Sequence, residues 1–229
     1  YIPPVGVFDP VLKLHWPYDQ LQAGATIAVP NSTNVLTTPT VANLSDDNGD
    51  SLIDDSDIPD IVFVTYVNAT TMGIDGTLRA ISGDDGHEIF TVTGYEVYPS
   101  TTVAIGDINN DGFVELVLDQ GADYNTVGFY VFSHTGQYLW EASGSGTYIG
   151  GAGISDIDHD GTPEILLANS VYDSVGNKKC TLEGNVYDWT APFALDLTGL
   201  ANDSIINRRG IWNYEVGNTT CPKLWSFQP

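Results

Sequence analysis

The chain has 229 residues, of which 42% are hydrophobic and 11% aromatic, so it can bury one large core or two small ones. Seven basic residues stand against 30 acidic ones, which gives a formal charge of −23. This balance argues against nucleic acid and anionic membranes as partners, because both bind cationic surfaces, and it favours cations. No apolar stretch is long enough to span a bilayer, so we expect no transmembrane segment.

Residues 1–36 are predicted to form an N-terminal extension. Between residues 5 and 16, the stretch VGVFDPVLKLHW has apolar residues in near alternation, which is typical of a β-strand. We expect it to be a free-standing strand that can be exchanged with a neighbouring chain. The chain begins at Tyr1 and not at Met, which suggests a processed N-terminus or a fragment.

Three short loops hold almost half of the acidic residues, within residues 46–60, 107–115 and 156–164. In the second and third loops, oxygen-bearing side chains stand at positions 1, 3, 5 and 9, and position 7 would add a backbone carbonyl. Because Ca²⁺ takes about six to eight oxygen ligands in flexible geometry, this spacing predicts calcium sites. The predicted ligands are Asp107, Asn109, Asp111, the carbonyl of Phe113 and Glu115, and then Asp156, Asp158, Asp160, the carbonyl of Thr162 and Glu164.

The first loop fits the same spacing less closely. Its predicted ligands are Asp46, Asn48, Asp50, the carbonyl of Leu52 and Asp54. Gly112 and Gly161 stand at position 6 of their loops, whereas this loop has Ser51 there and its glycine, Gly49, two residues earlier. Two interpretations therefore stay open: the site is rearranged, or it recruits Asp60, which precedes the next apolar run. We expect Ca²⁺ at two sites and leave the third open.

Two other interpretations of the loops are weaker. Mg²⁺ prefers rigid octahedral sites and gives up its water reluctantly. A solvated turn rich in Asp and Asn is ordinary for a single loop, but identical spacing in two loops argues against it.

The segments around the loops repeat as well. TTVAIGDINNDGFVELVL at 101–118 and GAGISDIDHDGTPEILL at 151–167 align without a gap, and an earlier copy lies at 38–63. Each loop is followed by an apolar strand and by a pair of strands around a glycine-containing turn, and four strands in roughly fifty residues is the size of a propeller blade. We therefore predict an all-β, β-propeller-like array of four-stranded antiparallel blades. Three blades fill residues 37–180, fewer than a closed propeller needs, so the array is expected to be incomplete or open.

The acidic loops resemble the calcium loops of FG-GAP/VCBS-type repeats, the blades of integrin-α-like β-propellers. The shared pattern, D-x-[DN]-x-D-G-x-x-E before an apolar strand, lies within about residues 38–180. The resemblance implies an extracellular, calcium-stabilised propeller used in adhesion, matrix or scaffolding. It does not imply one particular ligand.

The repeat is lost after Cys180, and residues 181–229 are predicted to be a divergent β-rich segment that completes the same domain. The two cysteines, Cys180 and Cys221, fit one disulfide in an oxidising compartment, and two buried free thiols are the alternative. Five Asn-x-Ser/Thr sequons suggest a glycoprotein from a secretory route. Their asparagines are Asn31, Asn43, Asn68, Asn202 and Asn218.

The sequence gives no converging set of catalytic residues: it has no serine in a nucleophile elbow and no phosphate-binding glycine loop. We therefore expect a non-enzymatic structural or adhesive module, secreted or attached to a cell surface. Open sheet edges and the apolar N-terminal strand favour self-association into a homo-oligomer or a surface filament by strand exchange. The alternative is a carbohydrate-binding propeller lectin, because some propellers of the resembled family bind sugars between blades.

Overall fold

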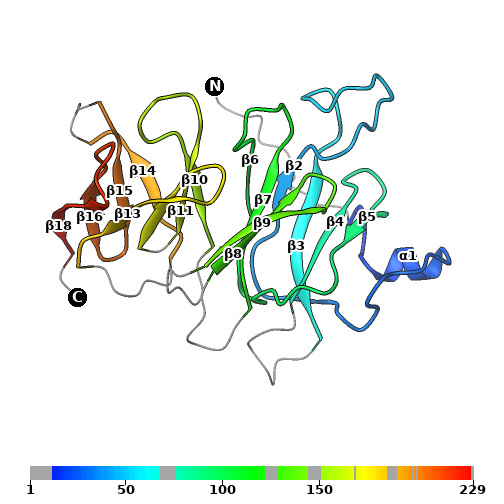
Figure 1. Ribbon diagram of the computed structural model, residues 1–229. Coiled ribbons are helices and arrows are strands. Elements are labelled where there is room, and N and C mark those ends of the chain that lie inside the picture. Colours follow the sequence, from blue (N-terminus) through cyan, green and yellow to red (C-terminus); the bar gives the residue numbers. More distant parts are fainter. Residues whose placement is uncertain are drawn as a thin grey trace, which may run out of the picture.

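The computed structural model describes residues 12–67, 76–121, 128–143, 151–167, 169–184, 190–197, 199 and 201–227. Within these residues the strands form four sheets that follow one another along the chain (Figure 1). The all-β prediction is confirmed, and the arrangement is that of an open, propeller-like array. The expected N-terminal strand lies mostly at residues 1–11, outside the described residues, and residues 12–16 are not in a strand.

Each sheet is antiparallel in its first four strands, and the strand bounds follow the chain. Sheet 1 contains β1 (Asn34–Val35), β2 (Thr40–Ala42), β3 (Asp60–Tyr66), β4 (Thr77–Ile81) and β5 (Glu88–Thr91). Sheet 2 contains β6 (Ala104–Gly106), β7 (Glu115–Asp119), β8 (Gly128–Ser133) and β9 (Tyr138–Ser143). Sheet 3 contains β10 (Gly153–Ser155), β11 (Glu164–Leu167), β12 (Ser170–Tyr172), β13 (Lys178–Leu182) and β17 (Thr220–Cys221). Sheet 4 contains β14 (Phe193–Leu195), β15 (Ser204–Asn207), β16 (Gly210–Asn213) and β18 (Lys223–Ser226).

In sheets 2 and 3 the second strand begins with a glutamate and continues as an apolar run, because it is covered on both faces. All five residues of β7 are buried. Side chains alternate between the faces of a strand, so Leu116 and Leu118 pack into the core shared with sheet 1, while Val117 packs into the core shared with sheet 3. We call the face toward the next sheet in chain order the forward face, and the opposite one the rear face.

The first strands of the sheets lie innermost. β2 contacts β6, β6 contacts β10, and β10 contacts β14. No comparable contact joins β14 to β2 in the described part of the chain, so the array stays open between sheet 4 and sheet 1.

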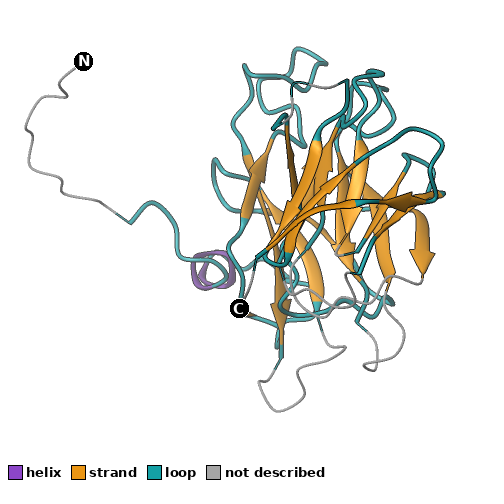
Figure 2. Cartoon of the chain, turned by 90° about the vertical axis from the view of Figure 1, so that its left-hand side faces the viewer, coloured by secondary structure: helices purple, strands orange, loops and turns teal. Residues whose placement is uncertain are grey.

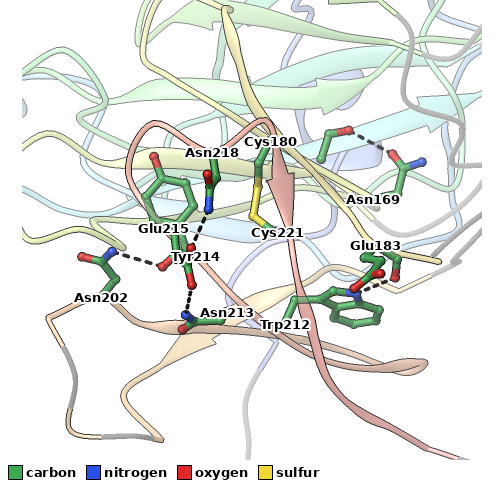
Figure 3. The surroundings of a disulfide bond; sticks show 11 residues. Asn169, Cys180, Glu183, Asn202, Trp212, Asn213, Tyr214, Glu215, Asn218 and Cys221 are labelled. Carbon is green, nitrogen blue, oxygen red and sulfur yellow. Dashed lines mark hydrogen bonds between the residues drawn. A yellow bond between two sulfur atoms is a disulfide. The ribbon is translucent and has the colours of Figure 1, made fainter.

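The disulfide joins two strands of sheet 3, β13 and β17, and so anchors the segment that leads into the last strand of sheet 4 (Figure 3). Cys180 lies in β13 and Cys221 in β17, which pairs in parallel with β13 and leads directly into β18. Both cysteines are buried, and the structure has the expected pairing, not two free thiols. A cross-link over 41 residues is worth about 4 kcal/mol in the chain-entropy estimate.

Residues 12–33, which we call the N-terminal cap, pack on the rear face of sheet 1. They include the short helix α1 (Tyr18–Gln22), seen beside the strands in Figure 2. Arg79 of β4 is fully buried, and its guanidinium donates to the backbone carbonyls of Ala28 and Val29 at 2.7 and 2.9 Å. It also bonds Glu88 at 2.9 Å and lies under the ring of Trp16. One buried cation therefore holds the cap on the sheet.

Candidate metal centres

The three acidic loops lie at the same end of the array, between β2 and β3, between β6 and β7, and between β10 and β11 (Figure 1). We number each loop from its first acid, so that Asp46, Asp107 and Asp156 stand at position 1. The antiparallel register fixes the loop ends. Gly106 pairs with Glu115, and Ser155 pairs with Glu164, so a tight loop must connect them.

All three loops have the same unusual backbone at positions 4 and 6. Gly49, Asn110 and His159 at position 4 have φ values of 79°, 61° and 59°. At position 6, Ser51 has φ 71° and both glycines have φ 91°. The left-handed region is unfavourable for residues with a Cβ atom, so a shared use of it at two positions shows a common loop design. The first loop therefore has the same backbone conformation as the other two. Its glycine stands at position 4, so the strained residue is the one at position 6, Ser51.

The acids at positions 1 and 5 organise the loop backbone. Asp107 accepts the N–H groups of Asp111 and Gly112 at 3.2 and 2.9 Å, and Asp156 does the same with Asp160 and Gly161 at 3.1 and 3.0 Å. In the first loop, Asp46 accepts the N–H groups of Gly49 and Ser51 at 2.6 and 2.9 Å, and the position 5 acids accept from the residues at position 7. These bonds hold the carboxylates turned inward, toward the middle of each loop.

Position 9 is a buried acid at the first residue of a core strand. Glu115 and Glu164 are each 2% exposed. Each accepts the backbone N–H of the isoleucine at position 2, Ile108 at 3.0 Å and Ile157 at 3.1 Å. In the second loop the amide of Asn109 also donates to Glu115. A carboxylate is therefore held at the bottom of each loop, against the apolar core.

In the first loop, Asp60 occupies the place equivalent to Glu115 and Glu164. It is the first residue of β3, it is fully buried, and it pairs with Ala42 as Glu115 pairs with Gly106. Its carboxylate accepts the N–H groups of Leu44 and Ser45. Asp54, at position 9 by sequence, is exposed and accepts the N–H of Ser56.

Asp57 has a structural part in the first loop that sequence spacing did not reveal. It is buried, and its carboxylate accepts the N–H groups of Asp54, Asp47 and Asn48. These donors, that of Asp54 first, lower the pKa of Asp57 below its usual 3.8. Asp57 therefore closes the six-residue insertion that separates Asp54 from Asp60.

The third loop brings its acids closest together. One carboxylate oxygen from each of Asp156, Asp158 and Glu164 lies within 4.8 Å of the others. The buried oxygen Oδ1 of Asp158 has no hydrogen-bond partner, and neither has Oδ1 of Asp60 in the first loop. Buried polar atoms are nearly always paired, so unpartnered anionic oxygens fit a cation better than a proton donor.

Burial makes the position 9 acids hard to ionise without a cation. Burial, with smaller repulsion from Asp158 and Asp160, raises the pKa of Glu164 from 4.5 to about 7. Burial also raises the pKa of Glu115, with repulsion from Asp111 and Asp107. The same environment raises the pKa of Tyr214 to about 12, first through burial and then through Glu164.

Neighbouring loops contact each other through position 4. The Asn110 amide donates to the carbonyl of Gly161 in the third loop at 2.7 Å. Nε2 of His159 in turn lies 3.2 Å from the carboxylate of Asp203, the residue just before β15 of sheet 4. The loops therefore form one continuous surface at this end of the array.

The corresponding loop of sheet 4 has the same length but has lost most of its acids. Asp196 stands at position 1 and accepts the N–H of Gly199, whose φ at position 4 is 64°. Ser204 pairs with Leu195 and so takes the place of Glu115. Positions 3 and 5 are Thr and Leu in the sequence, so this loop lacks the oxygen set of the other three.

The structure separates the sequons by accessibility. Asn31 and Asn218 are exposed, whereas Asn43 and Asn202 are partly buried. The amides of Asn43 and Asn202 donate to the carbonyls of Asp54 and Tyr214. Asn68 lies outside the described residues.

No family model matches the sequence, and no curated protein matches it. The FG-GAP/VCBS likeness therefore remains a resemblance of loops. Among solved structures, the chain is similar to the V. cholerae biofilm matrix protein Bap1, with 28% identity and a TM-score of 0.73 over 89% of this chain. The match covers 32% of Bap1, so this chain spans about a third of that protein's length.

Two polysaccharide lyases share the fold more distantly. Rhamnogalacturonan lyase YesW is 16% identical over 75% of this chain and 38% of its own, with a TM-score of 0.53. The Bacillus licheniformis rhamnogalacturonan lyase PL11 is 14% identical over 75% of this chain and 37% of its own, with a TM-score of 0.52. At this identity the likeness concerns the fold alone. In the described residues, no helix has the length and apolarity needed to cross a membrane.

Proposed function

We propose that this chain is an extracellular, non-enzymatic structural or adhesive module stabilised by calcium. The observation that carries the proposal is the repeated loop: three inward-turned acid sets on one backbone design, each ending in a buried acid at the start of a core strand. The similarity to a biofilm matrix protein and the disulfide, which persists outside the cytosol, support the extracellular part.

In this proposal Asp60, Glu115 and Glu164 are the ligands that join each ion to its sheet. The remaining ligands are those at positions 1, 3 and 5 and the carbonyls of Leu52, Phe113 and Thr162, while Asp54 is left to solvent. A bound divalent cation neutralises the crowded carboxylates and fixes the loop to the core strand.

Thermal unfolding in calcium and in chelator tests the proposal. We expect the chelator to lower Tm by about 10 °C or more, because each site saturated at about 100 times its Kd contributes about 2.7 kcal/mol, and two or three sites act together. The variant Glu164→Gln should lose part of this calcium effect. Glu141→Gln, at an exposed acid of β9, is the matched control and should keep it. Equal Tm values in calcium and chelator would refute structural calcium.

We further propose that the module self-associates, as a homo-oligomer or a surface filament. The outer edges of sheets 1 and 2, at β5 and β9, offer strands for pairing, whereas β17 covers the edge of sheet 3. The part of the predicted apolar strand that precedes the N-terminal cap, residues 5–11, is the donor strand in this proposal. Deleting residues 1–11 should abolish assemblies seen by electron microscopy if strand exchange builds them.

Carbohydrate binding is the second candidate, and one groove favours it. The groove has a volume of about 220 Å³ and lies between the first loop and sheet 2. In its wall the rings of Phe113 and His134 stack with their centroids 4.6 Å apart. Asp54 and Asp55 also line the groove. An aromatic face next to acids suits a sugar ring and its hydroxyls. A glycan array with the calcium-loaded protein, compared with its Phe113→Ala variant, tests this candidate.

The exposure of each asparagine predicts which sequons carry a glycan. We propose Asn31 and Asn218 as the glycosylated asparagines, and we expect intact-mass analysis of protein from a glycosylating host to find sugar there and not on Asn43 or Asn202.

A further inference from the structure

The groove between the first acidic loop and sheet 2 owes one of its walls to a segment that the other acidic loops lack. This segment is the insertion after Asp54, and Ile53, Asp54 and Asp55 line the groove where it begins. The second and third loops instead contact each other directly, since the amide of Asn110 donates to the carbonyl of Gly161. The groove is therefore a product of the insertion and not of the repeated loop design.

Hydrogen bonds fix the backbone of this acidic wall. The N–H of Asp54 donates to the carboxylate of Asp57 at 2.8 Å, and the carbonyl of Asp54 accepts the N–H of Asp57 at 3.1 Å. The amide of Asn43, which also lines the groove, donates to the same carbonyl. A wall held in this way loses little conformational freedom when a ligand binds, so it is suited to recognition.

The opposite wall is aromatic, and the repeat does not require it to be. Phe113 and His134 both line the groove, and their rings lie at 16° to each other. The imidazole stacks on the phenyl ring, yet Phe113 is still 43% exposed. In sheet 3 the equivalent residues of the loop and of the turn are Thr162 and Ser174. The exposed ring pair therefore has no part in the common fold, and it offers a flat apolar face to a ligand.

The groove carries negative charge without a cation to neutralise it. Asp54 and Asp55 are exposed, and neither forms an ion pair with a basic residue in the part of the chain that the structure describes. No lysine or arginine lines the groove. In the calcium proposal Asp60 replaces Asp54 as a ligand, so both carboxylates stay available. Since the chain has a formal charge of −23, an anionic ligand is repelled here and a cationic one is attracted.

We infer that the groove binds an amino sugar, with the sugar ring against Phe113 and the protonated amine beside Asp54 and Asp55. The groove volume of about 220 Å³ is below the roughly 300–1,000 Å³ of pockets for drug-sized ligands, so it suits one ring of an oligosaccharide. An N-acetylated sugar lacks the positive charge and a uronic acid has the opposite one, so both should bind more weakly. The inference rests on the carbohydrate candidate proposed above and names its substrate class.

Calorimetric titration of the full chain in calcium, at about pH 6, tests the inference. The probes are a glucosamine trimer, its N-acetylated form, a galacturonate trimer and trilysine. The glucosamine trimer should bind about tenfold more tightly than each of the others, or better. Trilysine has amines but no sugar ring, so it measures the contribution of charge alone.

Two groove variants and one control locate the binding. Asp54→Asn with Asp55→Asn should lose the preference for the amine, so that the glucosamine trimer and its N-acetylated form bind equally. Phe113→Ala should weaken the binding of both forms about tenfold. The control, Glu96→Gln with Glu141→Gln, removes two exposed carboxylates outside the groove and should bind as the native chain does. Native mass spectrometry should find the native number of calcium ions in every variant, because each keeps all the proposed ligands.

The possible outcomes separate this inference from the function on which it rests. If both trimer forms bind the native chain equally and Phe113→Ala weakens both, carbohydrate binding stands and the amine preference is wrong. A preference that survives in Asp54→Asn with Asp55→Asn overturns the inference, as does tighter binding of trilysine or of galacturonate. If no probe binds and the glycan array is also blank, both the inference and the carbohydrate candidate are wrong.

Discussion

Sheets 3 and 4 are held in the fold by different interactions. Sheet 3 begins its second strand with Glu164, a buried acid whose pKa is raised to about 7, and surrounds it with further carboxylates. Sheet 4 has Ser204 at the equivalent position and no such set of acids. It is held instead through β17, which the disulfide fixes to β13 just before the chain enters β18, and Trp212 donates its Nε1–H to the carbonyl of Glu183 at 2.9 Å (Figure 3). The left-handed residue at position 4 therefore occurs without the full set of acids, and in our proposal the acids mark the sheets that bind an ion.

Removing the disulfide should have the largest effect on the sheet that lacks a complete acid loop. We expect the double variant Cys180→Ser, Cys221→Ser to lose about 4 kcal/mol of unfolding free energy. Denaturant titration in calcium measures this loss. The loss should be about the same in chelator, because the cross-link acts by restricting the unfolded chain, whereas the ions would act on the folded loops. A loss that vanishes in chelator would show that the ion sites and the cross-link act together.

The pH dependence of stability should reverse between chelator and calcium. In chelator, the raised pKa of Glu164 means that the folded state binds more protons than the unfolded state between pH 4.5 and about 7. Its stabilisation is complete below pH 4.5 and is lost as pH rises through about 7, on the order of 3 kcal/mol. In calcium, stability should instead increase with pH, because the ion binds only the ionised carboxylate.

Melting curves at pH 5 and pH 7.5 check this reversal. Asp57 does not interfere, because its lowered pKa acts below pH 3.8. If stability in chelator rises over the same window, the buried acids are already paired in the apo protein.

Much of this arrangement could be predicted from the sequence. In the second and third loops, the interval from the first acid to the last one, Asp107 to Glu115 and Asp156 to Glu164, predicts the length of the loop. The apolar run after each glutamate predicts where the next strand begins. Asp60 could not be decided, since its place depends on pairing with Ala42 across an insertion.

The rest depends on contacts between distant residues. Sheet 4 was hidden because its loop has lost its acids, although Asp196 and Gly199 were present in the sequence as signals. The N-terminal cap depends on Arg79, which bonds residues about 50 positions away. A one-dimensional pattern does not contain such contacts.

In the first loop, changing Asp60 or Asp54 to asparagine should have different effects on stability. We expect Asp60→Asn to cost about 1–3 kcal/mol in calcium, because it removes a buried charged acceptor and a proposed ligand. Asp54→Asn, at an exposed acid, should change stability by about 0.5 kcal/mol or less. Calorimetric titration should also show one calcium site fewer in Asp60→Asn alone. Equal effects would mean that the first loop uses the spacing of its sequence.

The smallest effect is expected at Ser51, which takes the left-handed conformation that glycine takes in the other two acidic loops. Ser51→Gly should relieve this strain and raise stability by up to about 1 kcal/mol. Gly112→Ala should lower it by a similar amount, since it introduces the strain. Chemical denaturation measures both, and a stabilising Gly112→Ala would contradict the shared loop design.

The number of calcium ions bound to each chain tests the central claim most directly. Native mass spectrometry of the metal-stripped protein, titrated with calcium, should show three ions per chain, and two for Asp60→Asn. No retained ion at saturating calcium, with the fold intact, would contradict the account.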